Sequence, residues 1–203
     1  MKSSISEIVP IIGTSMGGGF YAGRIKIADA PFALIVAPKA DGDHKDAAWI
    51  AGGKSMPDAL SYFDGVANTK AIAEAGSKLA QWALDLRIGG FDDWYLPSLD
   101  ELEICYRNLK PTTVENWCYA RSGVNLSALE PTYPYAPHHP VQTLAKAFLA
   151  GGAQAFESAY YWTSTQHASA SDFAWFQDFS SGSQRYSYEA SELRARAVRR
   201  LPL

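Results

Sequence analysis

Ser15 has the sequence neighbours of a catalytic nucleophile. It lies at the centre of Gly13-Thr14-Ser15-Met16-Gly17, which matches the Gly-x-Ser-x-Gly pattern of a nucleophile elbow. Such an elbow needs a strand before the serine and a helix after it, so that the hydroxyl stands on a strained turn. Here a glycine run and a strand-like segment follow. The context favours a flexible hinge, and an esterase acting through Ser15 is a third hypothesis.

Two polar clusters contain residue types that ligate metals. Asp41, Asp43 and Asp46 resemble part of a calcium loop, but the glutamate that would complete an EF-hand is absent. We therefore expect a solvated acidic turn. His138 and His139 are adjacent, and adjacent side chains in an extended segment point in opposite directions. The sequence predicts no metal site and no cofactor.

Four arginines gather near the carboxyl end, at positions 194, 196, 199 and 200. Guanidinium groups match phosphate, sulfate and carboxylate groups, so the cluster suits a polyanion. The alternation of Arg194 and Arg196 with alanines is also what a half-buried strand requires. We favour ion pairs with acidic neighbours within the domain.

Residues 160–191 are dominated by Tyr, Trp, Phe, Ser, Gln and Asp, and they contain no Lys or Leu. Rigid aromatic rings with small polar residues are the composition of a binding surface. The alternative is an ordinary aromatic β-core, because strands favour aromatics in any case. Phe173 and Trp175 face one way and Ala174 and Phe176 the other, so one face is exposed or packed on a partner.

We assign ligand contact to this stretch, with rings that stack on sugar or protein groups and polar side chains that orient hydrogen bonds. The assigned residues are Trp162, Gln166, His167, Asp172, Trp175, Gln177, Gln184, Arg185, Tyr186 and Tyr188.

Composition limits the classes of protein that remain. The chain has 203 residues, of which 47% are hydrophobic and 19% charged, so it folds around a sizeable core. The net charge of −3 does not indicate a nucleic-acid partner. No apolar stretch is long enough to cross a membrane, and no secretory signal is evident. The two cysteines, Cys105 and Cys118, form one optional bridge at most.

The order of predicted elements indicates an α+β fold. Residues 1–19 predict a flexible attachment segment, and residues 20–203 a single domain. A β-hairpin is expected over 20–37. The segment 38–57 is rich in Gly and Asp and predicts a surface loop.

Helices are expected where apolar residues recur every three or four positions. One is predicted from Asn68 to about Leu86, and a second begins at the Ser98 capping box and ends near Leu109. A short third helix is expected over 140–149, after a long irregular excursion from 110 to 140. An antiparallel meander follows, with strands expected at 160–165, 173–179, 184–188 and 194–201.

Three blocks in this order resemble one known family. They are Asp92-Asp93-Trp94-Tyr95-Leu96-Pro97-Ser98, Tyr161-Trp162-Thr163-Ser164-Thr165 and Arg194-Ala195-Arg196-Ala197-Val198-Arg199. The pattern is similar to that of the C-terminal domain of Legionella collagen-like protein. The resemblance implies a C-type-lectin-like fold. It also implies a function as an adhesin or receptor-binding part, often in a trimer. Glu130-Pro131-Thr132 departs from the Glu-Pro-Asn of calcium-dependent sugar-binding lectins, which argues against calcium-dependent sugar binding.

The resulting hypothesis is a non-enzymatic recognition protein of a phage tail or tail-like particle. It binds a bacterial surface receptor, either a glycan or a pilus or outer-membrane protein, and it contacts other tail proteins as a homotrimer. It resides in the virion after assembly in the host cytoplasm, without membrane insertion. The alternative is a structural tail-tip or baseplate subunit that uses the same aromatic face for assembly.

Overall fold

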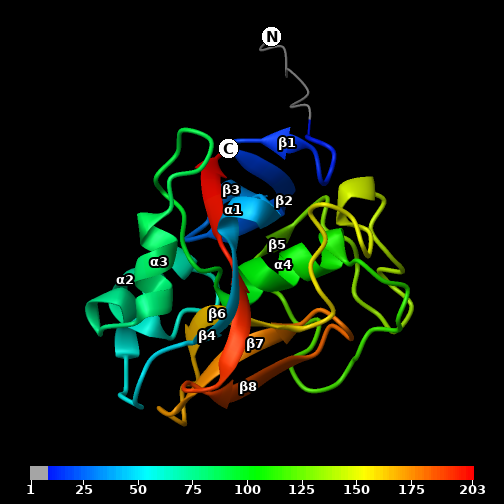
Figure 1. The fold of residues 1–203 in the computed structure, drawn as a ribbon. Helices are drawn as coiled ribbons and strands as arrows, with labels where there is room; N and C mark the ends of the chain where they lie inside the picture. Colours follow the sequence, from blue (N-terminus) through cyan, green and yellow to red (C-terminus); the bar gives the residue numbers. More distant parts are fainter. Residues whose placement is uncertain (1–8) are drawn as a thin grey trace.

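The structure is a computed structural model that describes residues 9–203, and within this range it combines helices with two five-stranded sheets (Figure 1). The predicted α+β class is confirmed. The strands are β1 (Ser15–Met16), β2 (Gly19–Ile27), β3 (Ala30–Val36), β4 (Asp43–Ala48), β5 (Ala128–Leu129), β6 (Tyr160–Gln166), β7 (Phe173–Asp178), β8 (Gln184–Tyr188), β9 (Glu192–Arg196) and β10 (Val198–Pro202). The helices are α1 (Lys39–Gly42), α2 (Gly65–Glu74), α3 (Lys78–Asp85) and α4 (Leu99–Leu109), with 3-10 turns at Pro57–Ala59 and Lys146–Phe148.

The first sheet has the order β1-β2-β3-β10, and β5 adds a short pairing to β2. The expected hairpin is β2 and β3, joined at Ala28 and Asp29. Both residues adopt positive φ angles of 47° and 66°, as a tight hairpin turn requires. The carboxyl-terminal strand β10 pairs with β3, so this sheet unites the two ends of the described chain.

The second sheet has the order β4-β9-β6-β7-β8, and β8 forms its edge. Strands β6, β7 and β8 are the expected antiparallel meander. The fourth expected strand is divided at Ala197. Its first half, β9, runs parallel to β6, while β10 crosses to the other sheet. The prediction of antiparallel neighbours throughout is wrong there.

Helix α4 lies between the sheets, and all eleven of its residues are buried. Its N-cap is Ser98, whose side chain accepts from the Glu101 amide while the Glu101 carboxylate accepts from the Ser98 amide. The predicted capping box is therefore present. Leu102, Ile104 and Cys105 pack in a core cluster shared with both sheets.

The other predicted helices are shorter than expected. The apolar period from 68 to 86 runs through two helices, α2 and α3, instead of one. The chain turns between them, where Gly76 takes a φ of +101° and Ser77 caps α3 through the Ala80 amide. Only the turn Lys146–Phe148 forms in the segment 140–149. Phe148 is nevertheless fully buried.

Two segments expected to be loops contain paired strands. Within 38–57, β4 pairs with β9, and Trp49 and Ile50 are buried. Within 1–19, β1 pairs with β2, and Ile12 packs against the core. The predicted flexible segment therefore does not extend over 11–19, and its residues 1–8 lie outside the described residues.

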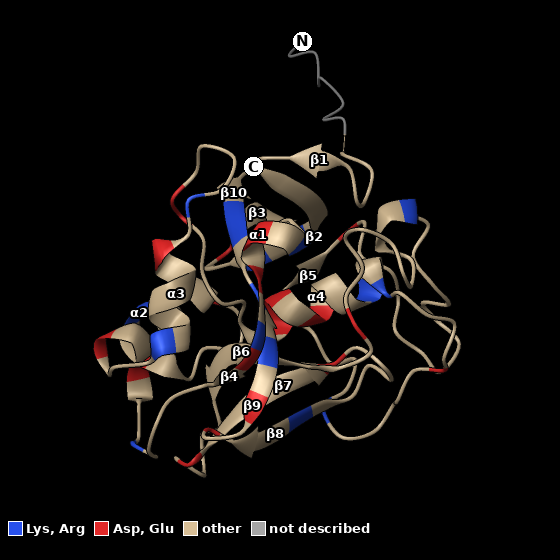
Figure 2. Cartoon of the chain, viewed as in Figure 1, with Lys and Arg blue, Asp and Glu red and all other residues tan. Residues whose placement is uncertain are grey.

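Acidic and basic residues are spread over both sheets and the helices, without a long segment of one sign (Figure 2). Among the described residues, no helix is long and apolar enough to cross a membrane.

The two sheets place the meander far from β1 and the carboxyl terminus. Strand β1 and the carboxyl terminus lie at one end of the molecule, and β7 and β8 lie at the opposite end (Figure 1). Helix α4 occupies the space between them.

Candidate functional site

A strip of aromatic side chains covers one face of β7 and β8. The register places Phe173 opposite Tyr188 and Trp175 opposite Tyr186, and opposed residues of antiparallel strands share a face. Ring centroids are 4.3 Å apart in the first pair and 5.5 Å in the second. Tyr186 is 50% exposed and Tyr188 62% exposed, so the strip presents its outer rings to solvent.

His167 joins the strip from the end of β6. Its imidazole centroid lies 5.4 Å from that of Trp175 and 4.4 Å from that of Tyr186. We call His167, Phe173, Trp175, Tyr186 and Tyr188 the aromatic strip. Because the rings contact one another on two paired strands, their positions in the strip are mutually fixed.

A groove runs beside the strip along the edge strand. It has a volume of about 640 Å³, and its lining includes Gln184, Arg185, Tyr186 and Ser187, four consecutive residues of β8. We call it the edge groove. The loop that follows α4 contributes two further exposed rings to its lining, Trp117 at 47% and Tyr119 at 72%. This volume lies within the range of small-ligand sites.

A chain of ring and charge contacts connects the strip to α4. Tyr62 meets Trp175 edge to face, and the Arg121 guanidinium lies 4.0 Å from the centroid of the Tyr62 ring. Arg121 Nη2 donates to Asp100 Oδ1 over 2.7 Å. Burial raises the pKa of Asp100, while hydrogen bonds from Ser127 and Arg121 oppose that shift. These contacts fix the position of Trp175 relative to the helix.

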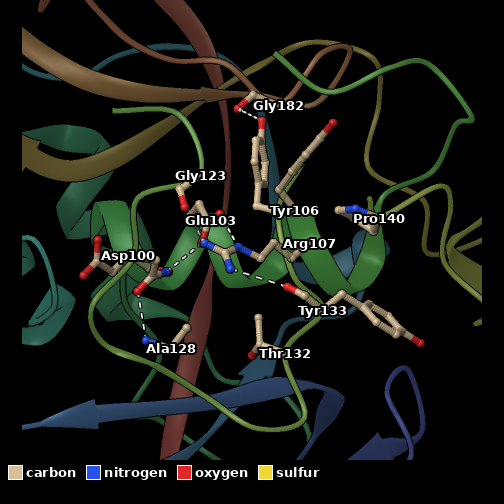
Figure 3. A network of polar contacts seen from close by, with 12 residues as sticks. Asp100, Glu103, Tyr106, Arg107, Gly123, Ala128, Thr132, Tyr133, Pro140 and Gly182 are labelled. Atoms are coloured by element: carbon tan, nitrogen blue, oxygen red, sulfur yellow. Dashed lines mark hydrogen bonds and ion pairs between the residues drawn. The ribbon is translucent and has the colours of Figure 1, made fainter. Parts of the chain in front are cut away.

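The loop beyond α4 is held by polar side chains of the helix itself (Figure 3). Glu103 is fully buried and accepts from Arg107 Nε at 2.5 Å and from Asn125 Nδ2 at 2.7 Å. Arg107 in turn donates to the carbonyls of Gly123 and Tyr133. A segment whose one regular element is the two-residue strand β5 is thereby tied to the core at several backbone positions.

The part of this loop next to the edge groove is fixed by Lys110 and Asn116. Lys110 Nζ donates to Asn116 Oδ1 at 2.7 Å and to the Pro140 carbonyl at 3.1 Å. Burial lowers the pKa of Lys110. The next residue, Trp117, donates its amide to Ser181 C=O at 2.7 Å, beside the start of β8. The loop that lines this side of the groove is thus held by Lys110 at Asn116 and by Ser181 at Trp117.

Six of the ten assigned residues lie at or near the surface. Asp172, Arg185, Tyr186 and Tyr188 are exposed, and His167 and Trp175 are half-buried. Apart from Asp172 and Arg185, they belong to the aromatic strip. Arg185 lines the edge groove.

The other four assigned residues are buried and cannot touch a ligand in this structure. Trp162 is fully buried and donates its indole N–H to Ala47 C=O. Gln166 bonds the backbone of Met56 and Lys54, and Gln184 bonds Leu99 C=O of α4. These two glutamines and Gln177 are at most 3% exposed. Gln166 lies against the segment before α2, whereas Gln177 and Gln184 oppose each other at the other end of the meander.

Comparison with known protein families finds a match for this chain. A family model described as the Lcl C-terminal domain matches residues 44–199, well over half of the sequence. The chain belongs to the Lcl C-terminal domain family. This confirms the resemblance drawn from the three sequence blocks. No curated protein matches the chain.

The blocks that mark the Lcl C-terminal domain contact one another in the fold. Asp93 of the first block accepts from Arg199 Nε and Nη2 of the third, at 2.6 and 2.9 Å. Tyr95 exchanges backbone hydrogen bonds with Val198. Arg194 of the third block donates to the Tyr161 hydroxyl of the second at 3.2 Å. The motif residues of this Lcl C-terminal domain therefore specify its scaffold, and the strip lies outside them.

The arginine cluster pairs within the domain, as we favoured. Arg194 and Arg196 approach Asp43, and Arg200 Nη1 lies 3.0 Å from Asp64. Asp43 is thus an ion-pair partner rather than part of a solvated turn. Ser15 is exposed in β1 and is followed by β2, so no strand-to-helix turn surrounds its hydroxyl. Among the described residues, no group of three or more potential metal ligands forms.

Sequence reasoning missed Tyr62, Trp117 and Tyr119 as neighbours of the strip. Trp117 and Tyr119 lie in the irregular excursion after α4, whose length is itself unusual for a loop without a function. The presence of two large rings in that excursion was the available signal. Tyr62 gave no such signal, because its contact with Trp175 depends on how α2 packs.

Beneath the loops next to the strip, Glu189 is a buried carboxylate of the Lcl C-terminal domain. It is 2% exposed and accepts from Gln166 Nε2 at 2.9 Å. Its backbone carbonyl also accepts from the Trp49 amide. Burial, reinforced by the nearby Asp172, raises the pKa of Glu189 to about 7 from 4.5, although the Gln166 hydrogen bond opposes the shift.

Glu189→Gln is expected to stabilise the protein at pH 8 and to leave its stability nearly unchanged at pH 4.5. A raised folded-state pKa means that wild type loses stability as the pH rises from about 4.5 through 7, because the charged form is disfavoured in the fold. The gain at pH 8 has an upper bound of about 3 kcal/mol. Urea unfolding at both pH values checks this, with Glu192→Gln as the exposed control. An equal gain at both pH values would contradict it.

Proposed function

We propose that this protein is a non-enzymatic recognition protein of a phage tail or tail-like particle, and that the aromatic strip binds a receptor on the bacterial surface. The observation that supports the proposal is the open row of rings on β7 and β8, held on paired strands. Rigid, exposed aromatics supply contact area at a small entropic cost. The C-type-lectin-like scaffold and trimeric assembly implied by the family resemblance belong to this same proposal.

The exposed tyrosines supply the direct test. The double variant Tyr186→Ala/Tyr188→Ala is expected to weaken binding to receptor-bearing cells at least ~10-fold, because hot-spot rings each contribute more than about 1 kcal/mol. Purified protein would be incubated with intact bacteria, envelope polysaccharide, and pilus or outer-membrane fractions. Both side chains are at least half exposed, so unfolding stability is expected to change by about 1 kcal/mol or less.

Leu144→Ala is the matched control. Leu144 is 85% exposed in the segment before the 3-10 turn and contributes to neither the strip nor the edge groove. Its loss is expected to leave binding unchanged. Cell binding that is equal in wild type and in the double variant would rule out the strip as the receptor contact.

A second candidate is a structural tail subunit whose strip packs against another subunit, since exposed ring clusters are also typical of subunit interfaces. Trp175→Ala separates the two functions. Loss of assembly in size-exclusion chromatography supports the structural function, whereas intact assembly with reduced adsorption to cells supports recognition.

A further inference from the structure

Strand β8 is an edge strand whose outward backbone groups are partly unused. Asp178 N–H donates to Ser183 C=O, so Phe176 with Arg185 and Ala174 with Ser187 are the next hydrogen-bonded pairs. Bonded and non-bonded pairs alternate in an antiparallel ladder. The N–H and C=O of Tyr186 therefore point away from β7.

The neighbours of Tyr186 limit the free stretch to its immediate surroundings. Gln184 N–H donates to Ser122 Oγ at 3.1 Å, and Tyr188 C=O accepts from Ser191 N–H at 2.8 Å. Gln184 C=O, both groups of Tyr186 and Tyr188 N–H remain for an outside partner. An added strand could therefore form one hydrogen-bonded pair with Tyr186, through both of its backbone groups. It could form one further hydrogen bond on each side, with Gln184 C=O and with Tyr188 N–H.

The edge groove provides space for such a strand. Four of the five β8 residues line it, and Trp117 and Tyr119 line it from the loop. Arg185 is the only charged residue in the lining, and within the described residues its side chain makes no ion pair or hydrogen bond. An acidic side chain on the added strand, across from Arg185, would form an ion pair with its guanidinium group.

We infer that the edge groove binds an extended acidic peptide segment of a partner protein, which pairs with β8 at Tyr186. This inference rests on the proposed recognition function and selects a protein receptor over a glycan. Backbone hydrogen bonds to Tyr186 would supply affinity, while Arg185 and the flanking rings would select the side chains.

The test uses the full chain and a bead-bound library of random heptapeptides. Wild type is expected to enrich peptides with Asp or Glu at alternate positions. The best peptide is then synthesised and its Kd measured against Arg185→Glu, Tyr186→Ala, Tyr186→Pro and the Leu144→Ala control. We expect Arg185→Glu to weaken binding at least ~10-fold, and Tyr186→Pro to weaken it at least ~10-fold beyond Tyr186→Ala.

The proline variant removes an outward N–H that β7 does not use, as edge strands tolerate. Methylation of single peptide nitrogens gives a second measurement that leaves the protein untouched, and one methyl position is expected to abolish binding. The inference is overturned if no acidic peptide is enriched, or if every methylated peptide binds like its parent. Binding of envelope polysaccharide that Tyr186→Pro and Tyr186→Ala weaken equally would also overturn it.

These outcomes are distinguishable from failure of the proposed function. If wild type binds cells and the double tyrosine variant does not, recognition by the strip stands even when no peptide is selected. If neither cells nor peptides bind, both proposals fall.

Discussion

Asp43→Ala is expected to lower the free energy of unfolding by about 3–5 kcal/mol, because it leaves buried guanidinium groups without their counter-ion. Arg194 Nη2 lies 2.5 Å from Asp43 Oδ1, and Arg196 Nη1 lies 3.7 Å from Oδ2. Arg196 is 0% exposed, and burial lowers its pKa to about 10 although Asp43 opposes that shift. Its remaining partners include the Ala37 carbonyl, which bears no full charge.

Urea unfolding of wild type, Asp43→Ala and Asp41→Ala measures the effect. Asp41 is an exposed residue of the same acidic segment, so its loss is expected to change stability by about 0.5 kcal/mol or less. Equal stability of Asp43→Ala and wild type would show that the pair is open to water. The same result would show that the Asp43–Arg194 ion pair does not stabilise the pairing of β4 with β9.

Trp162→Ala is expected to cost about 3–5 kcal/mol of stability, as truncation of a buried tryptophan does. The indole is 0% exposed, packs with the cluster that contains Trp49 and Ile72, and donates to Ala47 C=O at 2.8 Å. The sequence had assigned this residue to ligand contact. In the structure its contribution is to the core beneath the meander.

Thermal and urea unfolding of Trp162→Ala beside Tyr188→Ala checks this assignment. Tyr188 belongs to the same aromatic-rich stretch but is 62% exposed, so its truncation is expected to reduce binding with little loss of stability. Trp162→Phe keeps most of the buried volume and leaves Ala47 C=O without its donor, which costs about 1–3 kcal/mol. A Trp162→Ala protein with wild-type stability and no cell binding would restore the ligand assignment.

Local chemistry explains which elements were predictable from sequence. The hairpin of β2 and β3 and the capping box at Ser98 depend on residues within a few positions of one another. Strand β4 depends on β9, whose residues lie about 150 positions later, and on the pairing of Asp43 with Arg194. A polar segment that forms a strand for that reason looks like a loop until its partner is known.

The candidate site shows the same division. Alternation along β7 correctly placed Phe173 and Trp175 on one face, since that follows from strand geometry alone. How far along the strand this face stays open depends on α4, which contacts β7 and bonds Gln184. That boundary is a tertiary property. No pattern within 160–191 distinguishes the covered glutamines from the exposed tyrosines.

The separation of the carboxyl terminus from β8 determines how the protein can be displayed. A sensor surface or carrier coupled through Leu203 would hold the molecule by its first sheet and leave the rings of β7 and β8 facing the bulk solution (Figure 1). Several copies mounted in this way would point their rings in one direction. Weak individual contacts with a dense target would then add up to a long residence time through effective concentration.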